Sequence, residues 1–166
     1  MQRQQGDLPD PKDAREAMQR FSGFLPPKGD LELLVLKGHL LVEEGLHSLV
    51  ARKIRYPKAL KEANLGFFQI LHVAKGLCYA EDMAWLWDML GRLNRLRNQM
   101  AHSLDSGEFR LRVLQFLEPI SKSSQVADPE DLDAKLREAL YLLHLMTQTY
   151  SNRMFDHGKP PNFQQP

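Results

Sequence analysis

A cation stands on the apolar side of a helix-like segment, EDMAWLWDMLGRLNRLRNQMAHSL (81–104). At about 100° of turn per residue, Leu86, Leu90 and Leu93 form one stripe, and Arg97 falls about 20° from Leu86. A guanidinium stays charged at physiological pH, and burying it without a partner costs several kcal/mol. We therefore expect Arg97 to bind an anion, either a carboxylate of another helix or a ligand in a groove or subunit interface.

A strip of polar side chains accompanies this arginine. Asn94, Asn98 and His102 follow one another at i, i+4 and i+8, so they line one flank of the apolar stripe. A buried salt bridge requires one carboxylate, and it does not require an imidazole and two amides beside it. The strip therefore favours a binding site over a purely structural ion pair.

Two carboxylates could face Arg97. Glu43 and Glu44 lie in the segment 31–54, which is apolar nearly all round and is expected to be the central helix. Glu44 is the preferred partner because its side of the helix also carries Leu33 and Leu40. The alternative is that both glutamates lie on a solvated edge.

The remaining sequence predicts an all-α fold, a bundle of four main helices with short additional helices. No segment of the sequence shows the alternation of apolar and polar residues that is typical of β-strands. Residues 10–153 are expected to form one domain, with loose Pro- and Gln-rich tails at 1–9 and 154–166. The main helices are expected at 31–54, 57–77, 81–104 and 132–153, and shorter ones at 10–21 and 108–120.

Composition limits the partners. The chain has 166 residues, 43% hydrophobic and 26% charged, with a formal charge of +1, so any phosphate-binding surface must be local. Its single cysteine, Cys78, excludes a disulfide within one chain and favours a cytoplasmic location. No signal peptide or bilayer-spanning apolar run is visible, so no membrane association is expected.

The phrase LNRLRNQMAHSLD resembles the signature of the HEPN superfamily, an arginine followed by four to six residues and a histidine. Arg97, Asn98 and His102 occupy the motif positions, near the end of a long helix in an all-helical domain. The resemblance implies a metal-independent endoribonuclease of the toxin or antiviral type, without a cofactor. It also implies a homodimer whose motif helices meet, so that both copies of the motif line one cleft.

The chemistry that the resemblance implies suits these residue types. RNA supplies its own nucleophile, the 2′-OH, and cleavage leaves a 2′,3′-cyclic phosphate and a free 5′-OH. His102 would transfer the proton, because imidazole titrates near neutral pH. Arg97 would hold the scissile phosphate through paired hydrogen bonds, and Asn98 would orient the imidazole or the phosphate. Arg97 and His102 lie about 140° apart on an intact helix, so either the helix loosens or a second chain completes the site.

Other residues have weaker assignments. Arg92, Arg95 and Arg110 could steer an RNA backbone toward His102, although a charge run is more often a solvated face. His39, Glu43 and His47 form a polar line, expected to face solvent or a neighbouring chain and not to bind a metal. The aromatic residues are expected in the core and not as base-stacking platforms; they are Phe67, Phe68, Tyr79, Trp85 and Trp87.

A second function class remains open. The chain also resembles mannitol-repressor-like proteins, in a long helix with acidic residues and a later Arg-Asn phrase. That resemblance implies a non-catalytic helical module that acts through protein contacts. Arg97 and His102 together favour the nuclease. An antitoxin or another operon-encoded protein is a possible partner in either case.

Overall fold

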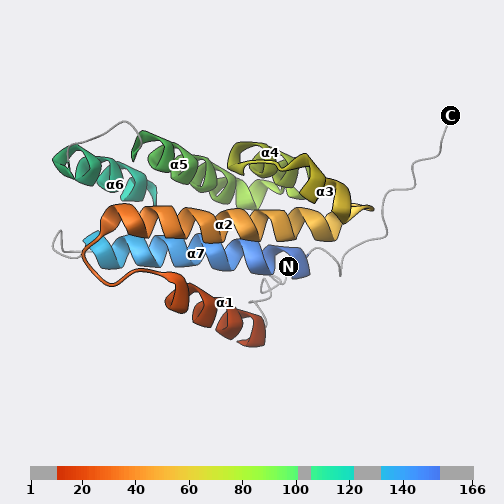
Figure 1. Cartoon of the computed structure of the whole chain (residues 1–166), viewed down its shortest axis with the longest axis horizontal. Helices are drawn as coiled ribbons and strands as arrows, with labels where there is room; N and C mark the ends of the chain where they lie inside the picture. Colours follow the sequence, from red (N-terminus) through yellow and green to blue (C-terminus); the bar gives the residue numbers. More distant parts are fainter. Residues whose placement is uncertain (1–10, 101–105, 122–131, 154–166) are drawn as a thin grey trace, which may run out of the picture.

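A computed structural model describes residues 11–100, 106–121 and 132–153. Within these ranges every regular element is a helix, which confirms the all-α helical bundle (Figure 1). None of the helices described is long and apolar enough to cross a bilayer. The elements are α1 (Pro11–Phe24), α2 (Leu31–Lys53), α3 (Pro57–Ala63), α4 (Phe67–Cys78), a 3-10 turn η1 (Glu81–Met83), α5 (Ala84–Met100), α6 (Ser106–Ser121) and α7 (Leu132–Arg153).

Helix α2 is the central element, as its nearly continuous apolar pattern predicts. Asp30 caps its N-terminus, because the Asp30 carboxylate accepts a hydrogen bond from the Leu33 backbone N–H at 2.8 Å. The helix packs along α7, with α1 on one side and α4 and α5 on the other (Figure 1). Its side chains Leu34, Val42 and Leu46 are fully buried. The central position of α2 means that any site on α5 is built against it.

The segment 57–77 is two helices and not one, so the prediction of a single third helix is wrong. Helix α3 ends at Asn64, which adopts the left-handed conformation with a φ of 46°. Helix α4 then begins after Gly66. Asparagine tolerates the left-handed conformation better than most other residues that carry a side chain. The break turns Phe67 back onto α2 and sets α4 beside α5.

The other boundaries follow the sequence more closely. Helix α7 covers the predicted range 132–153 and α2 ends one residue earlier than predicted. Residues 81–83 form a 3-10 turn before α5, so the fourth helix begins later than predicted. The expected cap Asp10, both tails and the C-terminal end of the motif helix lie outside the described residues.

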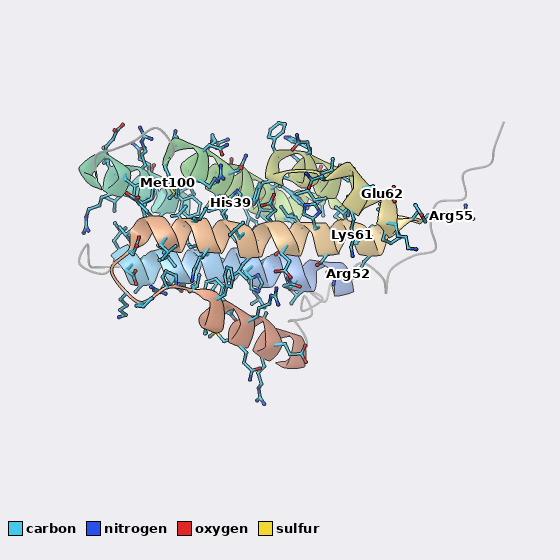
Figure 2. All side chains as sticks on the ribbon, viewed as in Figure 1. His39, Arg52, Arg55, Lys61, Glu62 and Met100 are labelled. Atoms are coloured by element: carbon cyan, nitrogen blue, oxygen red, sulfur yellow. The ribbon has the colours of Figure 1, made fainter. Side chains whose placement is uncertain are left out.

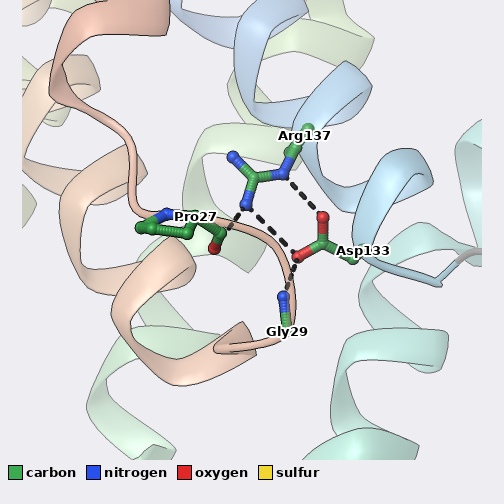
Figure 3. A network of polar contacts seen from close by, with 4 residues as sticks. All are labelled: Pro27, Gly29, Asp133 and Arg137. Atoms are coloured by element: carbon green, nitrogen blue, oxygen red, sulfur yellow. Dashed lines mark hydrogen bonds and ion pairs between the residues drawn. The ribbon is translucent and has the colours of Figure 1, made fainter.

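A polar network fixes the α1–α2 connection to the start of α7 (Figure 3). Arg137 donates from Nε to Asp133 Oδ1 at 2.6 Å and from Nη2 to the Pro27 carbonyl at 3.0 Å. The Gly29 N–H donates to Asp133 Oδ2 at 3.4 Å. Burial alone would raise the pKa of Asp133, but the hydrogen bonds from Arg137 and Gly29 lower it on balance. One carboxylate thus joins two segments distant in sequence.

Replacing Asp133 by alanine is expected to lower the free energy of unfolding by about 1–2 kcal/mol, since Arg137 and the Gly29 N–H both lose their acceptor. The matched control is Glu138→Ala on the same helix, whose exposed side chain predicts a change within about 0.5 kcal/mol. Urea unfolding of the two variants measures the difference. Equal losses would show that the network does not stabilise the fold.

Candidate functional site

Arg97 lies in the last turn of α5 and its side chain is exposed, so the prediction that it points into the apolar stripe is wrong for the single chain. Its Nη1 donates to Asn98 Oδ1 at 3.3 Å. In that turn the buried residue is Leu96, which lies beside Phe116 of α6. At its C-terminal end, the buried side of α5 therefore faces α6 instead of α2, and Arg97 is exposed.

The expected pairing of Arg97 with Glu44 is also wrong. Glu44 forms an ion pair with Arg20 of α1, and its side chain is half exposed. Leu33 and Leu40, on the same side of α2, are exposed as well. Glu44 therefore belongs to the side of α2 that carries α1, away from α5.

A polar contact between α2 and α5 joins His39 to Asn94; Figure 2 labels His39 on α2. His39 Nε2 lies 3.2 Å from Asn94 Oδ1, and the imidazole stacks on Phe67 with ring centroids 4.2 Å apart. Glu43 Oε2 lies 4.0 Å from His39 Nδ1. Because only 5% of His39 is exposed, the prediction that it faces solvent or a neighbouring chain is wrong.

Burial sets the charge state of His39. Desolvation lowers its pKa to about 4, the hydrogen bond with Asn94 opposes this shift, and the charge of Arg97 adds to it. At neutral pH the ring is neutral, so Nε2 donates its proton to Asn94 Oδ1. Two expected supporting residues, Asn94 and Glu43, thus lie around a buried neutral histidine within electrostatic range of Arg97.

The three expected RNA-binding arginines lie on α5 and α6. Arg92 forms an ion pair with Asp88 at 2.7 Å. Arg92, Arg95 and Arg112 line a shallow pocket of about 150 Å³ between the two helices. Arg110 is exposed on α6. His102, the proposed proton-transfer residue, lies outside the described residues.

Five aromatic residues were expected in the core, and the structure divides them. Phe67 and Trp87 are buried, as predicted. Phe68 is 61% exposed, Tyr79 is 51% exposed and Trp85 is 41% exposed, so the prediction is wrong for these three. The helical period places an aromatic ring on one side of its helix but does not show whether another helix covers that side.

A second basic surface was missed. The segment RKIRYPKALK (52–61) carries five cations, and Figure 2 shows Arg52, Arg55 and Lys61 at the C-terminal end of α2 and on α3. Their spacing in the sequence is a visible signal of local positive charge. This corner lies at the opposite end of α2 from the last turn of α5 (Figure 1). It is therefore a separate electrostatic feature and not part of the Arg97 site.

The expected polar line on α2 makes local contacts. His39 contacts Asn94, and His47 Nε2 lies 3.0 Å from the Leu65 carbonyl. Among the residues described, no three metal-ligating side chains gather into a cluster.

No family model, curated protein or solved structure matches the chain. The HEPN resemblance therefore rests on the motif residues and the helical architecture.

Proposed function

We propose that the chain is a HEPN-like, metal-independent endoribonuclease in which Arg97, Asn98 and His102 carry the reaction. Arg97 holds the scissile phosphate and stabilises the charge that develops on it. His102 transfers a proton between the ribose 2′-OH, the leaving 5′-oxygen and solvent. Asn98 orients the guanidinium. The products are a 2′,3′-cyclic phosphate and a 5′-OH.

The observation that carries the proposal is the exposure of Arg97 together with its contacts. Its guanidinium is exposed and contacts Asn98 Oδ1, and no carboxylate among the described residues forms an ion pair with it. A guanidinium without a carboxylate retains its bidentate donors for a phosphate. The neighbouring arginines of α5 and α6 add positive charge, which favours approach of an RNA backbone.

A candidate contact surface for a second subunit lies on α2. Leu33, Leu36 and Leu40 on α2 are exposed by 36%, 37% and 46% and lie within about 60° around the helix. Contiguous exposed apolar side chains on a helix are typical of a protein contact. The proposal therefore includes a homodimer that forms through this side of α2.

Arg97→Ala and His102→Ala are each expected to lower the rate of RNA cleavage at least about 100-fold, because each removes a group that acts in the transition state. Cleavage of bulk tRNA in EDTA, followed by analysis of the product ends, measures the loss and the chemistry. Circular dichroism verifies that the variants stay helical.

Arg15→Ala is the matched control, since this exposed arginine lies on α1, away from the motif. Its cleavage rate is expected to stay within about threefold of the unaltered chain, as for other surface substitutions outside a site. If Arg97→Ala or His102→Ala cleaves RNA as fast as this control, the assignment is wrong.

One observation favours a second candidate, the non-catalytic interaction module. The exposed leucines of α2 would serve a different protein equally well. The two functions differ in their response to Leu36→Lys, which places a charge in the apolar stripe. An interaction module loses its partner but has no RNA cleavage to lose, whereas a dimeric nuclease loses the dimer and the cleavage together.

A further inference from the structure

A groove of about 330 Å³ runs between α4 and α5. This volume lies at the lower end of the range of about 300–1,000 Å³ for small-molecule sites. Its walls combine aromatic, cationic and amide side chains on two antiparallel helices. They include Phe68 and Lys75 of α4, Tyr79 directly after α4, and Gly91, Asn94 and Arg95 of α5.

The aromatic rings are exposed where the groove opens. Phe68 and Tyr79 are each more than half exposed. His72 lies beside Phe68, with ring centroids 4.4 Å apart and planes inclined by 64°. Exposed aromatic rings that line a groove are the surfaces on which single-stranded nucleic acids stack their bases. Because every base has a flat face, such stacking does not depend on sequence.

The groove also carries positive charge. Lys75 Nζ lies 5.6 Å from the centroid of the Tyr79 ring. Arg95 folds back over Gly91, since its Nη1 would lie 3.8 Å from a Cβ at position 91. Asp88 is the acidic residue of the lining, and it already pairs with Arg92. A ligand with a flat ring and a nearby phosphate therefore fits the groove better than a neutral apolar ligand does.

We propose that the α4–α5 groove holds an unpaired base of the RNA strand whose phosphate lies at Arg97. This inference rests on the proposed function and adds a base-binding subsite to it. Asn94 lines the groove, and Asn98, four residues or about 6 Å farther along α5, contacts Arg97. A nucleotide bound through its phosphate at the end of α5 can thus reach the groove with its base.

Asn94 gives the subsite a polar contact for the edge of the base. Its Oδ1 accepts the hydrogen bond from His39, so the amide is held in one orientation. The amide nitrogen retains its donors, which can reach a base carbonyl or ring nitrogen in the groove. Asn94 is therefore a positioning residue for the base and not a catalytic one.

Gly91 provides the sharpest test, because a larger side chain there fills the groove from its floor. Gly91→Leu is expected to weaken binding of a single-stranded RNA of about six nucleotides at least about tenfold, the loss expected for one stacked base. Gly91→Ala is the matched control and should bind within about twofold. Both replacements favour the helix relative to glycine, so α5 is expected to stay folded.

The measurement uses the fluorescence of Trp87, which lines the groove, in chains that carry Trp85→Phe and His102→Ala. Saturable quenching by the RNA and by AMP, but not by ribose 5-phosphate, supports base binding. Equal quenching by ribose 5-phosphate, or equal RNA affinity of the two Gly91 variants, overturns it.

The two proposals fail separately. Binding is read in the His102→Ala background, where RNA is not expected to be cut. If the chain with His102 intact binds AMP in the groove but never cleaves RNA, the nuclease is refuted and the groove remains a nucleotide site. If that chain cleaves RNA and Gly91→Leu leaves both affinity and cleavage unchanged, the base subsite is refuted alone.

Discussion

Lowering the pH from 7 to 4 is expected to reduce the free energy of unfolding by about 3 kcal/mol through His39 alone. The pKa of this histidine is about 4 in the folded chain, against 6.5 for an unhindered imidazole. Between these values the unfolded chain binds a proton that the folded chain does not. The stabilisation is therefore complete above pH 6.5 and is lost as the pH falls toward 4.

The physical cause is the closed contact between α2 and α5. The ring lies between Phe67 and Asn94, and protonation would place a cation there without full hydration and near the charge of Arg97. Glu43, at 4.0 Å from Nδ1, does not offset the desolvation. Burial also lowers the pKa of His144, so the whole chain is expected to lose stability as the pH falls.

His39→Gln separates the two histidines. Glutamine can still donate to Asn94 but does not titrate, so the slope of unfolding free energy against pH should fall by about 1.4 kcal/mol per pH unit between pH 4 and 6.5. Urea unfolding at several pH values measures the slope. Equal slopes for His39→Gln and the unaltered chain would contradict the assignment.

Local patterns predicted the main helices because each carries its own signal. Asp30 precedes an apolar run and caps α2, and the periodic pattern of 132–153 gives both ends of α7. The break in 57–77 was missed because both halves share a helical period. Asn64 and Gly66 were the available signal, two residues that accommodate a turn within a continuous periodicity.

The candidate site was harder to predict because it depends on which helix covers which side. The apolar stripe on α5 was predicted from the periodicity of that helix alone. Packing of α5 against α6 buries Leu96 and not Arg97. Glu44 was placed on the correct helix, yet its partner Arg20 comes from α1. Hydrogen bonds between distant helices, such as that of His39 and Asn94, leave no mark in the periodicity of either helix.

A second large loss of stability is expected from a substitution at the contact between α2 and α7. These two helices approach closely at Gly45. A Cβ at this position would lie 2.2 Å from Thr147 Oγ1 and 2.9 Å from Thr147 Cβ. Thr147 is buried, and its hydroxyl donates to the His144 carbonyl at 2.8 Å, so its side chain cannot simply turn away. Alanine normally stabilises a helix by about 1 kcal/mol relative to glycine. At position 45 the steric overlap with Thr147 should cost more free energy than this helix propensity provides.

Gly45→Ala is therefore expected to lower the free energy of unfolding by about 2 kcal/mol. Gly38→Ala should cost less, because the nearest atoms there are the terminal methyl groups of Leu140, at 2.6 and 2.9 Å, which can rotate. Gly76→Ala is the matched control: nothing lies within 4 Å of a Cβ there, so it should stabilise α4 by about 0.5–1 kcal/mol. Thermal or urea unfolding gives the three values. The close approach of α2 to α7 is refuted if Gly45→Ala is as stabilising as Gly76→Ala, because helix propensity would then be the only difference that alanine makes.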